Sequence, residues 1–171
     1  HPSSLPDLCI TIEADGEDRW TERQPLDYRT ADPDAVRARL RDAGIVGLGG
    51  AVFPTHVKLS PGQQKIKTLI LNGAECEPWI TSDDLLMRER AAEIVEGIKI
   101  MAHLMQPEEV LIGIEDNKLE AIAAMQAACR STNFEVIAIP VRYPSGGEKQ
   151  LIKLLTGKEV PSGQRTINIG I

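Results

Sequence analysis

Short apolar runs alternate with helical periodicity through the second half of the chain. Three runs rich in β-branched residues and leucine are typical of buried strands: residues 67–73 (KTLILNG), 109–115 (EVLIGIE) and 134–141 (FEVIAIPV). Apolar residues recur at helical spacing in three other stretches: 88–105, 117–130 and 143–155. This regular alternation of strand and helix predicts an α/β fold, in which a three-layer parallel sheet has helices on both faces in a Rossmann-like arrangement.

The first part of the chain predicts a separate element followed by a helix. Residues 9–20 (CITIEADGEDRW) alternate apolar and polar side chains around a central turn, which predicts a short N-terminal β-hairpin from a neighbouring module, followed by a linker. The acid and proline at positions 32–33 are typical of a helix start. We therefore expect residues 1–31 to be the end of a β module with its linker, and residues 32–171 to be the α/β domain.

Composition narrows the possible functions. The chain has 19 basic and 25 acidic residues, for a formal net charge of -6, and no dense run of Lys or Arg, so we expect no nucleic acid partner. Cys9, Cys76 and Cys129 match no zinc or iron–sulfur spacing, and their odd number favours a reduced setting. The sequence has no apolar run of about 18 residues, so it predicts no transmembrane segment. Because the chain begins at His1 and stops within an apolar alternation, we expect a piece of a longer polypeptide.

A glycine-rich loop is the first candidate for chemistry. Residues 44–58 (GIVGLGGAVFPTHVK) place four glycines before a phenylalanine and a final lysine. Glycines let backbone N–H groups approach an anion and lysine adds a charge, so the pattern suits a phosphate. Both common phosphate motifs fit badly, since the dinucleotide fingerprint needs glycine in place of Val52 and the NTPase loop needs Gly-Lys-Ser/Thr. A tight turn without a ligand stays open as the alternative.

Two further loops follow predicted strands. Residues 72–78 (NGAECEP) follow the first strand and residues 142–148 (RYPSGGE) follow the third. The carboxyl ends of parallel strands meet at one edge of a sheet, where ligands bind in such folds. We therefore expect the two loops to converge.

Aromatic and acidic side chains accompany these loops. Phe53, Trp79 and Tyr143 border the three segments and suit a ligand with a flat ring. Glu75 and Glu77 would repel a phosphate, but they can accept hydrogen bonds from sugar hydroxyls or a ring N–H. A ligand with a phosphate at one end and a polyol or ring at the other is implied. The alternatives are aromatics that fill core gaps and glutamates that are simply solvated.

Taken in order, the motifs GLGGAVFPTHVK, NGAECEP and YPSGGEKQLI resemble the flavin- and NADH-binding domain of the RnfC-type component of the Rnf electron-transport complex. That component is itself related to the FMN-binding flavoprotein of respiratory complex I. The resemblance runs from about Asp32 to the end of the chain. It implies the fold of the complex I FMN-binding domain and identifies the preceding hairpin with the edge of the N-terminal module.

The resemblance also implies a set of cofactor-binding residues. They comprise glycines that line FMN, a lysine that reaches the flavin, polar residues that hydrogen-bond it, and an aromatic on the NADH side. In this sequence they are, in chain order, Gly47, Gly49, Gly50, Phe53, Lys58, Asn72, Glu75, Glu77, Tyr143, Gly146 and Glu148. No side chain is implied as a catalytic nucleophile and none as a metal ligand, because the hydride transfer belongs to the cofactor.

Four positions depart from the complex I pattern. Leu48 stands where that family has arginine, Val52 where it has glycine, Ala74 where it has aspartate and Gly147 where it has a second glutamate. These changes alter the charge around the dinucleotide more than around FMN. The asparagine-containing segment that helps to close the flavin site, and the cysteine clusters for two 4Fe-4S centres, are not in this sequence.

The function implied by the resemblance is electron input to a membrane-associated electron-transport complex. FMN and NAD(H) would bind here, and electrons would pass between NADH and 4Fe-4S clusters outside this piece, as in a component of an NADH:ferredoxin oxidoreductase. The piece alone would be inactive in the full reaction. The partners implied are the other subunits of the complex and ferredoxin, with the protein peripheral at the cytoplasmic face of the bacterial inner membrane.

Two alternatives stay open. The chain could be a non-catalytic docking module of the same kind of complex, with an incomplete cofactor site. It could also be a phosphate-binding enzyme of another class, in which Glu77 or Glu148 acts as a general base.

Overall fold

A parallel three-stranded sheet forms the middle layer of the protein. The computed structural model describes residue 6 and residues 8–47 and 52–171. Strands β1 (Thr68–Gly73), β2 (Glu109–Glu115) and β3 (Phe134–Ile139) pair in the order β1-β2-β3, and both pairings are parallel. The three strands lie within the three predicted apolar runs, so the α/β fold class with a parallel sheet is confirmed.

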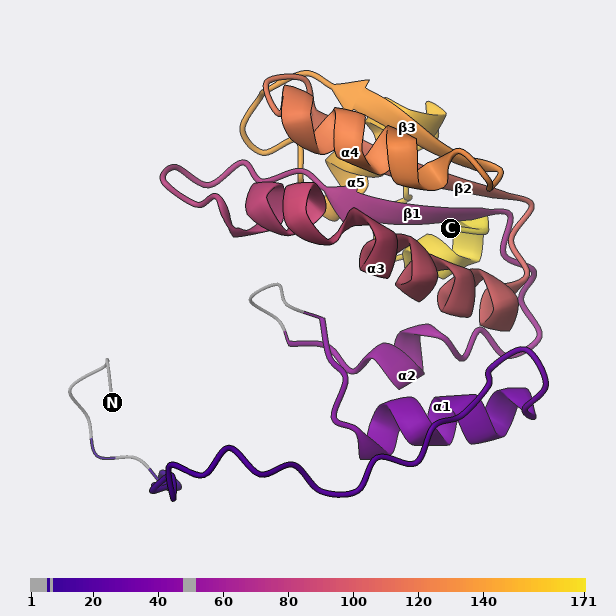
Figure 1. Ribbon diagram of the computed structural model, residues 1–171. Coiled ribbons are helices and arrows are strands. Elements are labelled where there is room, and N and C mark those ends of the chain that lie inside the picture. Colours follow the sequence, from indigo (N-terminus) through magenta and orange to yellow (C-terminus); the bar gives the residue numbers. More distant parts are fainter. Residues whose placement is uncertain (1–5, 7, 48–51) are drawn as a thin grey trace.

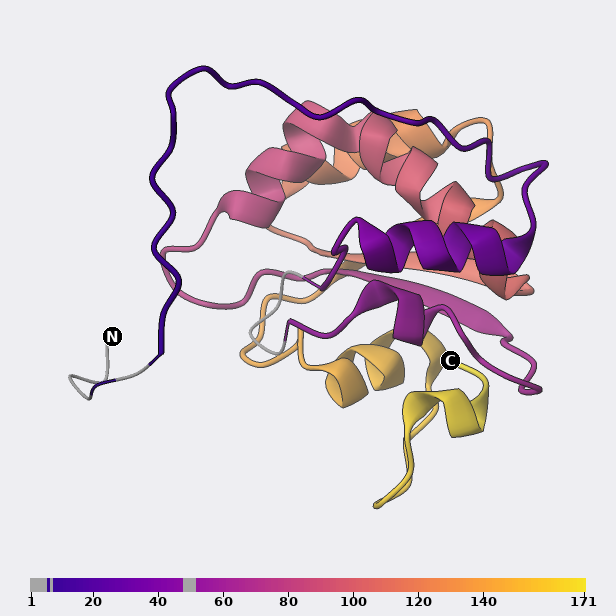
Figure 2. The ribbon, with the colours of Figure 1, turned by 90° about the horizontal axis from the view of Figure 1, so that it is seen from below.

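Helices cover both faces of this sheet. Helices α3 (Ser82–Met105) and α4 (Leu119–Cys129) lie on one face, and α5 (Glu148–Thr156) lies on the other (Figures 1 and 2). Helices α1 (Pro33–Asp42) and α2 (Thr55–Lys58) lie beside the carboxyl-terminal half of α3. A short 3-10 helix, η1 (Thr166–Ile169), comes before Gly170, whose carbonyl accepts hydrogen bonds from the backbone of residues 67 and 68.

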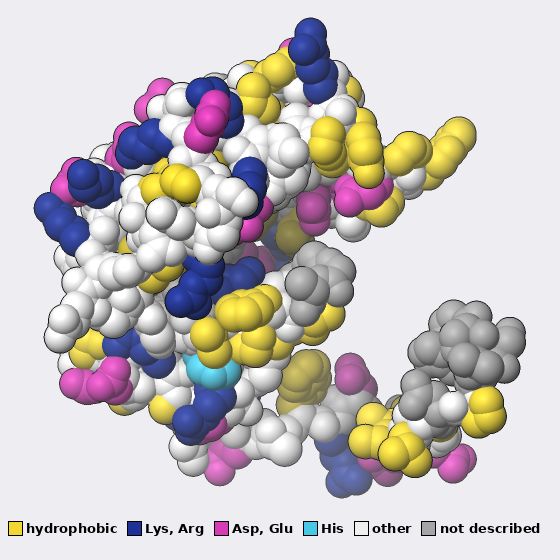
Figure 3. All heavy atoms as spheres, turned by 180° about the vertical axis from the view of Figure 1, so that it is seen from behind, with side chains coloured by type: hydrophobic (Ala, Val, Ile, Leu, Met, Phe, Trp, Pro, Cys, Tyr) yellow, Lys and Arg dark blue, Asp and Glu magenta, His cyan; other side chains and the backbone are white. Residues whose placement is uncertain are grey.

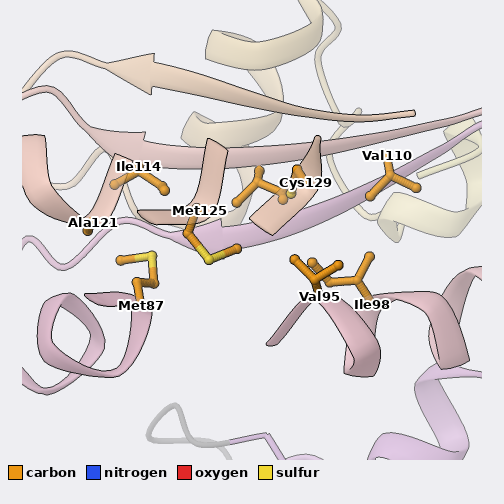
Figure 4. Packing of buried hydrophobic residues seen from close by; sticks show 9 residues of the cluster. Met87, Val95, Ile98, Val110, Ile114, Ala121, Met125 and Cys129 are labelled. Atoms are coloured by element: carbon orange, nitrogen blue, oxygen red, sulfur yellow. The ribbon is translucent and has the colours of Figure 1, made fainter. Parts of the chain in front are cut away.

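The alternation of side chains along β2 explains the two covered faces. Val110, Ile112 and Ile114 are buried in a cluster with residues of α3 and α4, and Figure 4 shows how most of this cluster packs. Gly113 faces the other way. A Cβ added there would lie 3.0 Å from a methyl carbon of Leu151 on α5, so the glycine allows that helix to approach the strand closely.

A second, smaller cluster joins α1 and α2 to the rest of the molecule. Its buried members are Val36 of α1, Leu59 after α2 and Leu104 of α3, and Tyr28 and Ala31 pack against them. Part of the predicted linker therefore contacts the α/β domain.

The first helix begins as the sequence predicts. The Asp32 carboxylate accepts hydrogen bonds from the backbone N–H groups of Asp34 (2.9 Å) and Ala35 (3.4 Å), and Pro33 occupies the first helical position. The predicted start of α3, in contrast, is wrong by six residues: the helix begins at Ser82 rather than at Arg88.

The predicted N-terminal hairpin does not form. No strand is present among residues 8–31, and the alternating apolar side chains of this segment face solvent, with Ile10 90% and Ile12 86% exposed. The physical reason is that an isolated two-stranded hairpin is marginal in water, and the apolar side chains of this segment are not buried against the sheet or its helices.

Candidate cofactor site

The two ends of the glycine-rich loop are held together by backbone hydrogen bonds. The Gly47 N–H donates to the Phe53 carbonyl (2.8 Å), the Thr55 N–H donates to the Ile45 carbonyl (3.1 Å), and Val46 pairs with Pro54 in an antiparallel bridge. The predicted FMN contacts Gly49 and Gly50, together with Leu48, lie outside the described residues. Figures 1 and 2 both place the flanking residues on the side of the molecule where the strands have their carboxyl ends.

Lys58 lies over the base of this loop. Its Nζ would be 3.0 Å from a Cβ added to Gly47, so a side chain at that position would displace the ammonium. The same Nζ lies 5.8 Å from the centre of the Phe53 ring. Among the residues that the structure describes, no carboxylate lies within 4.0 Å of this ammonium. Lys58 is thus a cation that can take an external anion. Figure 3, which shows the molecule from behind, has basic and hydrophobic side chains side by side near the middle of the view.

The two other loops are joined directly. The Asn72 Nδ2 donates to the Gly146 carbonyl (2.8 Å), and the Asn72 Oδ1 accepts from the Ala74 N–H (3.1 Å). A Cβ on Gly146 would lie 3.1 Å from the Ala74 carbonyl oxygen and 3.3 Å from the Cys76 Sγ. The predicted convergence of the two loops is confirmed, and a side chain at position 146 would press on the facing loop.

Glu75 is bound inside the chain rather than open to a ligand. The residue is 6% exposed, and its carboxylate accepts hydrogen bonds from the Asp83 N–H (2.9 Å), the Asp84 N–H (3.4 Å) and the Ser82 hydroxyl (3.3 Å). Lys118 Nζ lies 3.5 Å from the Glu75 Oε2. A hydrogen bond from FMN to Glu75, as the resemblance implies, would have to share or replace one of these donors, so that role stays a prediction.

Burial alone would raise the pKa of the Glu75 carboxyl. The N–H groups of the first turn of α3 and the Lys118 ammonium outweigh burial and hold the pKa below its usual value. Glu75 therefore caps α3 as a carboxylate. This cap also explains why α3 begins earlier than predicted, since the acceptor comes from seven or more residues upstream and Thr81 makes no side-chain cap.

The remaining predicted residues are exposed at the same edge. Tyr143 is 80% exposed and Phe53 46%, and the carboxylates of Glu77 and Glu148 also lie open. Burial, followed by the nearby charges of Glu75 and Glu77, raises the pKa of Asp83 at the start of α3. The edge thus combines a cation at one end with exposed carboxylates at the other, which suits a ligand that is anionic at one end only.

A sizeable hollow lies elsewhere in the described part of the chain. About 600 Å³ of space is lined by the start of α1, residues 60–66 and the end of α3, and none of the predicted cofactor residues lines it. The charges there are already used, because Arg37 donates to the Leu59 carbonyl (2.7 Å) and to the Asp34 carboxylate (2.8 Å), and Lys65 pairs with Glu108 (2.6 Å). The carboxyl edge, where no described carboxylate pairs with Lys58, is the better candidate.

Sequence reasoning missed three charged residues at this edge: Asp83, Glu115 and Lys118. Glu115 ends β2 and Lys118 follows three residues later, so both sit at the carboxyl end of a strand of the predicted sheet. Their place at the carboxyl end of a predicted strand is the signal from which the sequence could have indicated them. In the described part of the chain, no group of three or more His, Cys, Asp or Glu residues is placed to hold a metal ion. The helices described here include none that is long and apolar enough to span a membrane.

Comparison with known families shows the family of this chain. Residues 40–171 match the family described as the Nuo51 FMN-binding domain. The match covers most of the chain, and the chain belongs to this family.

The curated relatives are longer proteins. The chain is 57% identical over its whole length to the C subunit of the ion-translocating oxidoreductase complex from Yersinia pestis bv. Antiqua (strain Antiqua), of which it covers 28%. It is 53% identical, again over its whole length, to the protein of the same name from Pasteurella multocida (strain Pm70), of which it covers 21%. The chain therefore spans about a quarter of the length of these curated relatives.

A solved structure shares the fold. The NAD⁺-reducing [NiFe]-hydrogenase in the air-oxidized state matches with a TM-score of 0.63 and 27% identity, over 74% of this chain and 24% of the hydrogenase chain. The described residues fit an FMN ligand, because the Lys58 ammonium, which none of their carboxylates pairs, suits a phosphate. The joined 72–78 and 142–148 loops leave polar groups and an aromatic open at the same edge.

Proposed function

We propose that this chain binds FMN and NAD(H) as the electron-input domain of a membrane-associated, multi-subunit ion-translocating oxidoreductase. Membership of an FMN-binding family supports the flavin, and the names of the relatives and of the hydrogenase support the complex and the dinucleotide. The observation that carries the proposal is the direct link between the 72–78 and 142–148 loops at one sheet edge. On the same side of the molecule, the Lys58 ammonium lies over Gly47 with no carboxylate partner among the described residues.

Each part of the edge has its own task in this proposal. Lys58 and the glycine-rich loop hold the FMN phosphate through a charge and backbone N–H groups. Asn72 and Gly146 fix the two loops against each other, while Glu77 and Tyr143 border the ring and the nicotinamide. FMN held by these residues would supply the redox chemistry that links a two-electron hydride donor to one-electron acceptors. The chain contributes position and electrostatics.

In this proposal, electrons pass from the flavin to redox centres in the rest of the polypeptide. The 4Fe-4S clusters of the proposed relay belong to segments outside this piece, and ferredoxin is the proposed redox partner beyond them. The protein would be peripheral at the cytoplasmic face of the bacterial inner membrane, and this piece alone would not complete the natural reaction.

The docking alternative has one observation in its favour. Trp79 is 101% exposed, and its neighbour Ile80 is 46% exposed, at the same edge as the candidate site. Such side chains suit a protein partner as well as a ligand ring. The general-base alternative is less favoured, because the Glu77 and Glu148 carboxylates are exposed rather than buried in a pocket.

Calorimetric titration with FMN tests the proposal. We expect saturable one-to-one binding, and Lys58→Ala should weaken it about 10- to 100-fold, the effect of one lost charged hydrogen bond. Gly146→Ala should weaken it about tenfold by forcing apart the two joined loops. The matched control is Lys65→Ala, which removes a lysine paired with Glu108 away from the candidate edge.

Three results would speak against the flavin proposal. They are no binding by the folded wild type, equal losses in Lys58→Ala and Lys65→Ala, and unchanged affinity in Gly146→Ala. NADH is then added anaerobically to the FMN complex. Bleaching of the flavin absorbance supports NAD(H) binding, whereas FMN binding without bleaching supports the docking alternative.

A further inference from the structure

A buried carboxyl that no motif predicts lies at the centre of the carboxyl edge. Glu115 is the last residue of β2, the middle strand, and it is 1% exposed. Its Oε1 is buried and has no hydrogen-bond partner among the described residues. Because a buried, unpartnered carboxylate oxygen is costly, the protonation state of Glu115 matters to the stability of this edge.

Two other charged groups share this interior position. The backbone N–H of Glu75 donates to the Glu115 carboxyl, and the Lys118 N–H donates to the Glu115 backbone carbonyl (3.0 Å). The Lys118 ammonium, with its side chain 16% exposed, lies 3.5 Å from the Glu75 carboxylate. The Asp116 side chain is exposed to solvent, although its charge also acts on Glu115.

The donors are divided unequally between the two carboxyls. Glu75 accepts from two backbone N–H groups, a hydroxyl and an ammonium, which is the environment of a carboxylate. Within the described part of the chain, Glu115 has one backbone N–H donor. The Lys118 ammonium pairs with Glu75 and also acts electrostatically on Glu115. One positive charge thus serves two buried carboxyls, and the charges balance when one carboxyl keeps its proton. The unequal donors decide that this is Glu115.

We propose that Glu115 and Lys118 are positioning residues for the predicted cofactor loop, holding residues 73–79 through Glu75 in a buried cluster whose single proton resides on Glu115. The proposal rests on the proposed function in that Asn72 and Glu77, which flank Glu75, are predicted FMN contacts. Burial raises the pKa of Glu115, against the opposing effects of the Glu75 N–H and the Lys118 ammonium, in agreement with a protonated group.

The cluster makes the loop sensitive to pH in a defined direction. The folded pKa of Glu115 is raised, so the unfolded chain, with an ordinary glutamate pKa of about 4.3, loses this proton first. Between these two pKa values the folded state binds more protons than the unfolded state, and stability from this group falls as pH rises. Deprotonation would place a second negative charge beside Glu75 and loosen the loop.

The first test needs no cofactor. Thermal unfolding of the FMN-free chain is followed between pH 4 and pH 9 for wild type, Glu115→Gln and Lys118→Met. Glutamine mimics the protonated acid, so Glu115→Gln should lose less Tm than wild type as pH rises. Lys118→Met should lower the Tm by several degrees at neutral pH, and Lys118→Arg should restore most of it. The matched control is Lys153→Met. Lys153 is an exposed lysine of α5 that pairs with Glu159, and its loss should leave the Tm unchanged.

Infrared spectroscopy of protein with ¹³C-labelled glutamate reads the proton directly. Wild type at pH 7 should show a protonated carboxyl band that Glu115→Gln lacks. An identical spectrum for the two proteins, or parallel Tm curves between pH 4 and pH 9, would overturn the proposal. So would a Tm for Lys118→Met equal to that of wild type.

FMN titrations of the same variants test the link to the cofactor loop. Lys118→Met should weaken FMN binding about tenfold, with recovery in Lys118→Arg, and wild type should lose affinity at high pH where Glu115→Gln does not. Unchanged FMN affinity in Lys118→Met would overturn the positioning role. If wild type binds no FMN, the proposed function fails, while the unfolding and infrared results still decide where the proton resides.

Discussion

The candidate site is shared between two regions that are held together very differently. The loops at residues 72–78 and 142–148 extend from a sheet whose core is closely packed by α3 and α4. The glycine-rich loop and Lys58 belong instead to the α1–α2 unit, which rests on α3 through the small cluster around Val36, Leu59 and Leu104. An apolar hollow of about 230 Å³ remains beside this unit, lined among others by Ile45, Thr55 and residues of α3.

This difference in packing matters for a cofactor site, because the ring and the phosphate would be held by different regions. The loops that border the proposed ring position extend from the sheet that carries the larger buried cluster, so we expect their geometry to be set before a ligand arrives. The part proposed to hold the phosphate is packed through a smaller cluster, and segments with few buried apolar contacts open more readily than the core. Ligand binding would then close the weaker contact between the two regions.

Core truncations should show the contrast most strongly. Ile112→Ala removes a side chain that is 2% exposed in the sheet core and should lower the free energy of unfolding by about 2–5 kcal/mol. Leu59→Ala should cost less, because the second cluster has fewer buried members than the sheet core and can partly collapse around the change. Urea unfolding measures both values.

Amide hydrogen exchange compares the stability of the two regions separately. Leu59→Ala should speed amide exchange in α1 and leave β2 protected, whereas Ile112→Ala should speed exchange throughout the sheet. Equal acceleration of both regions in both variants would show that the α1–α2 unit is not separate from the core.

The second expected effect concerns the polar link between the regions. Arg37 of α1 donates to the Leu59 carbonyl (2.7 Å) and to the Leu104 carbonyl (3.4 Å), and so ties α1 to the segment after α2 and to the end of α3. Arg37→Ala should cost about 1–3 kcal/mol, through the lost hydrogen bonds and the carbonyls left without a partner. Arg41→Ala is the control, since this arginine of α1 is exposed and pairs with its neighbour Asp42. A loss in Arg41→Ala as large as that in Arg37→Ala would contradict this assignment.

The fold was accessible to sequence reasoning where the signals are local. The apolar runs of β1, β2 and β3 and the cap at Asp32 follow from neighbouring residues alone. The start of α3 could not be predicted in this way, because its acceptor is the Glu75 side chain from the preceding loop. The hairpin was over-predicted for a related reason: alternation indicates a strand only when a surface exists for its apolar face to cover.

In the candidate site, too, some features follow from the sequence and others only from the tertiary structure. The meeting of the 72–78 and 142–148 loops followed from the rule for parallel sheets, and the Asn72–Gly146 hydrogen bond bears it out. Glu115 and Lys118 escaped prediction because a glutamate at the end of a strand reads as solvated. Only the tertiary structure reveals that it is buried beside Glu75. The predicted contacts of the individual residues with FMN stay predictions.

A smaller effect, of opposite sign, is expected beside the apolar hollow. Gly97 lies in the interior of α3 and lines this hollow, and a Cβ added there would meet no described atom within 4 Å. Gly97→Ala should therefore raise the free energy of unfolding by about 0.5–1 kcal/mol, because alanine loses less conformational entropy in a helix. Urea unfolding decides this, and a loss of stability would mean that the hollow closes in solution.

The smallest effect is expected at the edge of the glycine-rich loop. Val52 has a φ of 47°, in the left-handed region that costs a non-glycine residue about 1–2 kcal/mol. It is also the position where the complex I pattern has glycine. Val52→Gly relieves this strain but adds backbone entropy to the unfolded chain, about 0.5–1 kcal/mol, so the net gain in stability should lie between zero and about 1.5 kcal/mol. Val52→Ala keeps the Cβ and should gain little. If glycine and alanine raise the free energy of unfolding equally, the strain does not lie in the backbone of Val52. If glycine alone raises it and FMN binding is retained, the left-handed conformation at Val52 destabilises this region without being needed for the site.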